Sequence, residues 1–447
     1  MGIGWTKSGQ VVQGKYMNIV SHNAIGGRLE EGDYLEPWLR LHLIKKPEDP
    51  DALQVDLQTS VEMFSNGAGI LGDLANGDQD NLKIFPEQAY IEARNVFTKG
   101  LTVWIGSRLY RKNDVHIADY FYFDKLVGEG VGVVYDMGKA GNLDFAILTR
   151  TGVTSFFKSD VPTGPTSSFK GAIRQTTMFN LEYKVPLGMG TSYVQGMGQF
   201  HVVPRSAIQD FQTAPAVNPP DWGAVGGLKL HLDFGGDNFN DTSIRFGNRI
   251  ANGAEGGAQT YQTFGTSNID GTYKGAYGIE FVDHFDWDIK DIVGINGYVM
   301  AHYSHGASDL EPSAGPRDPT RCSDGNPTCV NSRGDYAVGV RPTFYVTDQF
   351  HILTEATYSA RKDDQNAQGT LLKLAIAPTI VPTGSSTGCA APACAGRSSW
   401  TRPHIRFMYV FGYYNQAAQD QVMSGFLATV GPTKFAHFLG IRTEWWL

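Results

Sequence analysis

The chain has 447 residues, including 53 glycines, 20 tyrosines, 25 phenylalanines and 8 tryptophans, and its formal net charge is −8. This composition favours many short strands and turns over long helices. An acidic chain without a basic run is not expected to bind nucleic acid. No apolar run reaches the roughly 18 residues of a transmembrane helix, so a β-barrel is the one membrane-spanning design left open.

The beginning of the chain, residues 1–5, lacks the basic stretch and apolar core of a signal peptide. Either such a peptide has been removed, or the numbering begins inside the mature chain. The first clear structural signal starts at Tyr34, where polar and apolar residues begin to alternate.

Alternation with period two predicts strands, because successive side chains of a strand point to opposite faces. Residues 34–43 have one polar face and one apolar face, made respectively of Tyr34, Glu36, Trp38, Arg40 and His42, and of Leu35, Pro37, Leu39, Leu41 and Leu43. Residues 53–63 repeat the pattern, and so do residues 404–411. The last strand sets Arg442, Glu444 and Trp446 against Leu439, Ile441 and Trp445.

Three features favour a barrel over a soluble sandwich, which would give the same alternation with its apolar face inward. The charges on the polar faces suit a water-filled lumen, and aromatics crowd the strand ends near 409–414 and 120–123 like the girdles of outer-membrane barrels. Long polar loops alternate with short turns, as expected of extracellular loops and periplasmic turns; these loops are 64–86, 206–224, 306–334 and 382–401. At roughly 25 residues per strand, the length predicts about 16–18 strands in a single barrel over 1–447.

The four cysteines form two close pairs, Cys322/Cys329 and Cys389/Cys394, in stretches rich in Pro, Gly, Ser and Asn. Local disulfides in an oxidising compartment are the simplest interpretation. A metal site is less favoured, because neither pair has the C-x2-C spacing or a nearby histidine pair. The sequence has no G-x-S-x-G, P-loop or H-E-x-x-H motif, so we expect neither an enzyme nor a cofactor.

Residues 106–124 read GSRLYRKNDVHIADYFYFD and resemble the third loop of the maltoporins, a family of sugar-specific porins, in which this loop folds inward. Weaker matches to the same family lie at 1–5, 90–93, 338–342, 402–406 and 440–446. The resemblance implies an all-β fold, a transmembrane antiparallel barrel of about 18 strands. It also implies a homotrimer embedded in the lipid of the outer membrane of a Gram-negative bacterium.

The resemblance further implies a transport mechanism. A row of aromatics, the greasy slide, stacks against the apolar faces of sugar rings, and an ionic track of charged groups exchanges hydrogen bonds with their hydroxyls. Several weak sites in series allow both entry and exit. On this basis Trp446 lies on the slide, Arg28 on the track, and Asp114 and Asp119 match the two carboxylates of the third loop.

Other positions depart from the family pattern. Lys112 stands where the family has arginine, Phe121 replaces the constriction tyrosine, and Ile91 replaces a track arginine. Glu36 occupies the position of a slide tyrosine, although Tyr34 and Trp38 lie on the same face. Near the late slide tryptophan the chain has Asp335 and Tyr336. The pattern therefore leaves open a sugar other than maltodextrin, or a broader selectivity.

We expect facilitated passive diffusion of an oligosaccharide, maltodextrin-like in the family, through the lumen. The alternatives are a porin for another solute or for solutes in general, a barrel that sheathes or docks another protein, and an outer-membrane hydrolase.

Simpler roles also exist for the site residues. Trp446 could belong to an aromatic girdle, Arg28, Arg40 and Lys112 could be ordinary wall charges, and Asp114 and Asp119 could brace the third loop against Arg108 and Arg111.

Overall fold

The structure is a computed structural model, and it describes residues 2–6, 8–13, 17–19, 33–44, 49, 51–65, 82–153, 173–208, 216–253, 259–265, 267–268, 271–289, 292–307, 330–364, 366–382 and 397–444. Two predicted site residues, Arg28 and Trp446, lie outside the described residues, and so do the four cysteines.

Nearly all the regular structure in these ranges belongs to one antiparallel sheet of 20 strand segments. Its strands are β1 (Gly2–Thr6), β2 (Val11–Gln13), β3 (Asp33–Leu35), β4 (Trp38–His42), β5 (Gln54–Ser65), β6 (Leu82–Arg94), β7 (Leu101–Tyr110), β10 (Leu126–Asp136), β11 (Asn142–Val153), β12 (Ile173–Pro186), β13 (Tyr193–Val203), β16 (Asp221–Gly235), β17 (Asn238–Asn248), β18 (Tyr277–Ile289), β19 (Val293–His305), β20 (Ser332–Tyr345), β21 (Phe350–Asp363), β22 (Gly369–Ile380), β23 (His404–Tyr414) and β24 (Phe435–Glu444).

The remaining elements are short. Two small hairpins are formed by β8 (Asp114–Val115) with β9 (Tyr120–Phe121) and by β14 (Ser206–Ile208) with β15 (Ala216–Asn218). The helical segments are η1 (His116–Ala118), η2 (Gly138–Ala140), η4 (Arg249–Ala251), α2 (Gln416–Asp420) and α3 (Gly425–Val430). No helix within the described ranges is long and apolar enough to cross a membrane.

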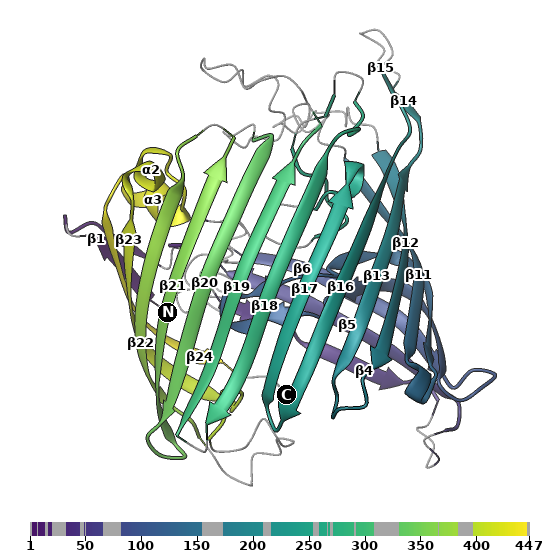
Figure 1. The fold of residues 1–447 in the computed structure, drawn as a ribbon, viewed down its shortest axis with the longest axis horizontal. Coiled ribbons are helices and arrows are strands. Elements are labelled where there is room, and N and C mark those ends of the chain that lie inside the picture. The colour runs from purple at the N-terminus through teal and green to yellow at the C-terminus, as the bar shows by residue number, and fades with distance from the viewer. Residues whose placement is uncertain are drawn as a thin grey trace.

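Successive long strands pair with their neighbours in the chain, and β1 pairs with both β2 and β24, so the first and last strands lie side by side. Figure 1 shows that the sheet curls round, with β16 to β22 facing the viewer and β4, β5 and β6 behind them. Within the described residues no ladder joins β2 to β3 or β4. The predicted closure and strand number therefore stay predictions.

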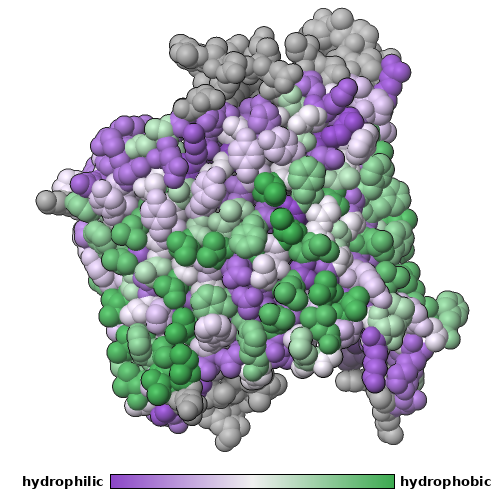
Figure 2. Space-filling view, viewed as in Figure 1, coloured by the Kyte–Doolittle hydropathy of each residue, from purple (hydrophilic) through white to green (hydrophobic). Residues whose placement is uncertain are grey.

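The two faces of the sheet differ as the alternation predicts. Leu39, Leu41 and Ile441 point outward and are 50%, 45% and 51% exposed, whereas the polar residues between them point to the inner side. A soluble sandwich would bury this apolar face, so that alternative is wrong. In Figure 2 apolar side chains are spread over the strands of the visible face, and hydrophilic residues gather toward the end that carries α2, α3, β14 and β15. Such an outer surface suits contact with lipid.

The two ends of the sheet differ in the length of their connections. Short turns such as 187–192 and 346–349 lie at one end, and the ends of β5, β13 and β19, where predicted long loops begin, lie at the other. The prediction for 382–401 is wrong. Because neighbouring strands are antiparallel, the connection after β22 lies at the same end as turn 346–349 after β20, the end of the short turns.

The outer face yields the first testable prediction. Val299, near the middle of β19, is exposed on the apolar side. We expect Val299→Arg to lower the free energy of unfolding in lipid vesicles by about 2–4 kcal/mol, because a charge is then placed in the hydrocarbon. The matched control is Val346→Arg, which makes the same change at an exposed valine in turn 346–349. An equal loss for both variants would contradict the proposed lipid contact.

Candidate functional site

The segment between β7 and β10, residues 111–125, crosses the interior of the curled sheet. It forms the β8–β9 hairpin around η1. Four hydrogen bonds tie it to β17, β18, β20 and β24, which are far from it in sequence, and these join Tyr122 to Asp241, Tyr120 to Glu280, Arg341 to the carbonyl of Ile117, and His116 to Glu444. The segment thus lies on the inner side, as the sequence predicts. We call it the inward loop.

Apolar packing fixes the far side of the inward loop. Tyr120, Tyr122 and Phe123 are fully buried in a cluster with side chains of the wall. The prediction that residues 120–123 belong to an interfacial girdle is therefore wrong. Gly227 of β16 allows the close approach, because a Cβ there would lie only 2.8 Å from Cε2 of Phe123.

Two cations anchor the near side of the inward loop to the wall. Lys112 Nζ lies 2.8 Å from both Asp144 Oδ2 and Glu182 Oε2. Arg111 contacts two carboxylates of the β3–β5 wall, at 2.6 Å from Glu36 Oε2 and 3.1 Å from Glu62 Oε1. Because each cation contacts two carboxylates at these points, the loop is held by charge-assisted hydrogen bonds.

Arg108 does not brace the loop carboxylates as one interpretation of the sequence expected. Its guanidinium lies over three rings, 4.8 Å from the centroid of Tyr90, 5.0 Å from that of Trp104 and 5.5 Å from that of Tyr110. These are cation–π distances. Arg108 thus belongs to the wall formed by β6 and β7.

Burial shifts two neighbouring ionisable groups at the end of the inward loop in opposite directions. It raises the pKa of the Asp124 carboxyl to about 7, although Asn113 donates a 2.7 Å hydrogen bond to it. It lowers the pKa of the Lys125 ammonium to about 8. In each case burial disfavours the charged form.

Three predicted residues, Tyr34, Glu36 and Trp38, lie on the first part of the sheet. Tyr34 donates hydrogen bonds to Glu36 and to Glu62, the two carboxylates that bind Arg111. Trp38 lies directly opposite Ser60, which is buried on the inner face. Trp38 therefore points to the interior, where its side chain is 55% exposed.

The predicted residues of the inward loop have different environments. Asp114 Oδ2 lies 3.8 Å from His116 Nδ1, and its Oδ1 is buried without a hydrogen-bond partner in the described part of the chain. Asp119 ends η1 in a left-handed conformation, with φ of 49°. The ring of Phe121 is contacted by Arg111 and Lys125 at 4.7 and 5.1 Å from its centroid.

The prediction that Tyr336 lines the solute path is wrong. It lies on the exposed outer face of β20, and its neighbour Asp335 takes the inner side. A shift of one residue in register moves a side chain to the other face, so Tyr336 does not share a surface with Trp38.

Sequence reasoning missed two further segments that enter the interior. Residues 17–19 are fully buried, and their backbone carbonyls and Asn18 accept hydrogen bonds from Tyr414, Lys373 and Arg361. No periodic pattern marks so short a segment. The second segment, residues 397–403, belongs to the long connection at the turn end.

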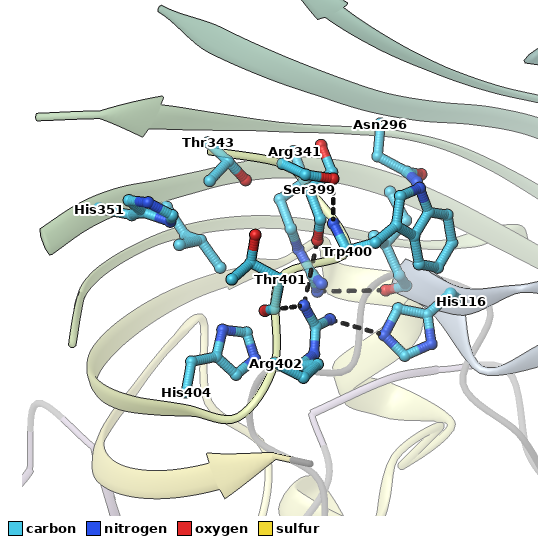
Figure 3. A pocket seen from close by; sticks show the side chains of 13 residues that line it. His116, Asn296, Arg341, Thr343, His351, Ser399, Trp400, Thr401, Arg402 and His404 are labelled. Atoms are coloured by element: carbon cyan, nitrogen blue, oxygen red, sulfur yellow. Dashed lines mark hydrogen bonds between the residues drawn. The ribbon is translucent and has the colours of Figure 1, made fainter. Parts of the chain in front are cut away.

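Residues 397–403 and the tip of the inward loop enclose a pocket (Figure 3). The ring of Trp400 lies 5.6 Å from that of His116. Arg402 donates a hydrogen bond to Glu444, and its Nη2 lies 3.2 Å from His116 Nε2. The described lining includes two arginines and three histidines but no carboxylate, namely Arg341, Arg402, His116, His351 and His404. The match at 402–406 marked this segment in the sequence, but it gave no sign that the segment enters the interior.

Together these features define a class of protein. An antiparallel sheet with an apolar outer face, a charged inner face and a loop folded into its interior is the architecture of a porin, a passive channel of the Gram-negative outer membrane. Comparison with known families agrees, since the LamB porin family matches residues 1–446. The chain belongs to the LamB porin family, whose members are channels rather than enzymes.

Individual relatives are more distant. A maltoporin of Hahella chejuensis (strain KCTC 2396) is 24% identical over 453 residues, which span the whole of this chain and 90% of that protein. A maltoporin of Photobacterium profundum is 30% identical over 94 residues, 21% of this chain and 22% of that protein.

Two solved structures are also similar to this chain. Pseudomonas aeruginosa OccK10 (OpdN) has a TM-score of 0.38 at 8% identity and covers 93% of this chain and 96% of its own. A loop L8 deletion mutant of Vibrio cholerae OmpT has a TM-score of 0.37 at 10% identity, and the match covers 99% of this chain and 96% of that mutant.

The packing of the inward loop yields the second prediction. We expect Gly227→Val to push Phe123 away from the wall, to destabilise the protein by about 1–3 kcal/mol, and to change the single-channel conductance in planar bilayers. The control is Gly226→Ala, because a Cβ at this adjacent residue meets nothing within 4 Å. An unchanged conductance for Gly227→Val would show that the inward loop does not narrow the path.

Proposed function

We propose that this porin allows facilitated passive diffusion of oligosaccharides along the inner wall formed by β3 to β7 and the adjoining side of the inward loop. The observation that carries the proposal is the half-exposed indole of Trp38 on this wall, beside charged side chains that are also exposed. Aromatic rings stack on the apolar faces of sugars, and charged groups hydrogen-bond their hydroxyls.

Several weak contacts in series support passage rather than retention. Tyr34 lies four residues before Trp38 on the same face, about 13 Å away at a rise of roughly 3.3 Å per residue. Tyr34 packs against Phe64, with ring centroids 4.8 Å apart. In this proposal Trp38 and Tyr34 provide successive stacking positions, and Trp446 and Arg28 take the slide and track roles that the family resemblance implies.

Polar groups of the inward loop complete the proposed path. Asp114, whose side chain is 30% exposed, would accept a hydrogen bond from a sugar hydroxyl. Lys112 keeps 40% of its side chain exposed while it binds two wall carboxylates, so it could donate to a passing hydroxyl. Glu36, Asp119 and Phe121 would shape the passage by holding Tyr34, η1 and the two loop cations.

We further propose the finer architecture that the family resemblance implies. Residues 1–447 would form one closed barrel of about 18 strands, three copies would assemble into a homotrimer, and each cysteine pair would form a local disulfide. A general porin, or one for another solute, is the second candidate, because Ile91 and Glu36 replace residues of the family's sugar path. The inward loop argues against a sheath for another protein, which needs an unobstructed interior.

The third prediction tests the sugar path by single-channel recording in planar bilayers. Added maltooligosaccharides should interrupt the ionic current in a concentration-dependent way. We expect Trp38→Ala to raise the half-blocking concentration roughly fivefold, the equivalent of about 1 kcal/mol of lost stacking.

The control is Trp287→Ala, which removes an indole of similar exposure from the outer face and should leave the block unchanged. If no sugar interrupts the current, the proposal of oligosaccharide transport is rejected and a general porin remains as the candidate function. A block unaffected by Trp38→Ala would remove Trp38 from the path.

A further inference from the structure

A cluster of cationic side chains lies on the inner wall beside Trp38. Arg40 and His42 come from β4, Arg94 from β6 and Arg108 from β7, and all four surround two carboxylates, Asp56 and Glu92. The strand register places Asp56 directly opposite both His42 and Glu92. We call this group, Arg40, His42, Arg94 and Arg108, the cationic cluster.

The two carboxylates do not saturate the cationic cluster. Three guanidinium groups share two carboxylates, so the group has an excess of at least one positive charge. Arg40 lies 3.5 Å from Asp56 Oδ2 and 3.7 Å from Glu92 Oε1, which are distances of ion pairs rather than of hydrogen bonds. Within the described residues Arg40 makes no hydrogen bond of its own, and Arg108 Nη1 is buried without a hydrogen-bond partner.

The cations face the solute path, and the carboxylates lie behind them. The side chains of Arg40, His42 and Arg94 are 44%, 40% and 33% exposed, but those of Asp56 and Glu92 are only 1% and 10% exposed. A solute on this wall therefore meets guanidinium and imidazole groups first. Because a guanidinium fork binds planar anionic groups through two parallel hydrogen bonds, the unused donors suit an acidic substituent.

Four other carboxylates of this region are already paired with cations of the inward loop. Glu36 and Glu62 bind Arg111, and Asp144 and Glu182 bind Lys112. At the turn end, the two arginines of the pocket in Figure 3 are also paired, Arg341 with Glu355 and Arg402 with Glu444. The cationic cluster thus differs from these pairs, because its cations outnumber its carboxylates and are more exposed than they are.

We propose that the cationic cluster binds an acidic group, a carboxylate or a sulfate ester, on a saccharide whose ring stacks on Trp38. Trp38 and Arg40 are two residues apart on the same face of β4, so one sugar unit can contact both. The porin then prefers anionic oligosaccharides to neutral ones. The saccharide part of this inference rests on the proposed function, but the preference for anions rests on the cationic cluster alone.

The test compares three trisaccharides in single-channel recordings: trigalacturonate, a sulfated maltotriose and neutral maltotriose. We expect at least one acidic trisaccharide to block the current at a roughly tenfold lower concentration than maltotriose, and the more potent of the two identifies the acidic group. In the double variant Arg40→Gln/Arg94→Gln this ratio should fall toward one. The control is Lys99→Gln, which removes an exposed cation paired with Asp51 outside the interior. This variant should leave the ratio of blocking concentrations unchanged.

A potassium chloride gradient across the bilayer separates this inference from the proposed function. The cationic cluster predicts that the double variant loses chloride preference relative to the native porin, whether or not any sugar blocks. If no trisaccharide blocks but chloride preference falls, the sugar function fails and the anion site stands. Equal block by acidic and neutral sugars, or a double variant with unchanged ratio and unchanged chloride preference, would overturn the inference. Channel formation by each variant reports that it has folded.

Discussion

The structure depends on one constraint: every strand of the wall has lipid on one face and water on the other. The backbone hydrogen bonds are satisfied between strands, so side chains alone decide which face meets lipid and which meets water. On β4 successive side chains point to opposite faces, with Leu39 and Leu41 outside and Arg40 and His42 inside. The charges that transport requires are tolerated in a membrane protein because this alternation turns them inward.

The inward loop divides the polar interior into two parts. Against β16 to β20 it forms a dry contact, in which Tyr120 and Phe123 are buried and Tyr120 donates a 2.6 Å hydrogen bond to Glu280. Buried pairs of this kind are costly to break, so this contact fixes the position of the inward loop. On the side of β3 to β7, Trp38, Arg40 and His42 stay exposed. The proposed solute path therefore follows the wall that the loop leaves uncovered.

The sequence predicted the faces of strands well, because period two is visible wherever one face is apolar. It also identified the inward loop from residues 106–124. It failed where the outcome depended on register or on contacts distant in sequence. Tyr336 is one residue from the inner position of Asp335. Residues 382–401 were assigned to the wrong end of the sheet, because the end is set by the number of preceding strands and not by the length of the loop. Residues 17–19 are buried only through contacts with β21, β22 and β23, which no local pattern encodes.

The central claim is that the apolar faces meet lipid and the charged faces line water, and two adjacent residues of β4 test it most directly. In a background with the native cysteines replaced by serine, Leu41→Cys and His42→Cys would be treated with a charged, membrane-impermeant thiol reagent during bilayer recording. The account predicts that His42→Cys reacts and its current changes, whereas Leu41→Cys stays unmodified. Equal reaction at both positions, or reaction at Leu41→Cys alone, would contradict it.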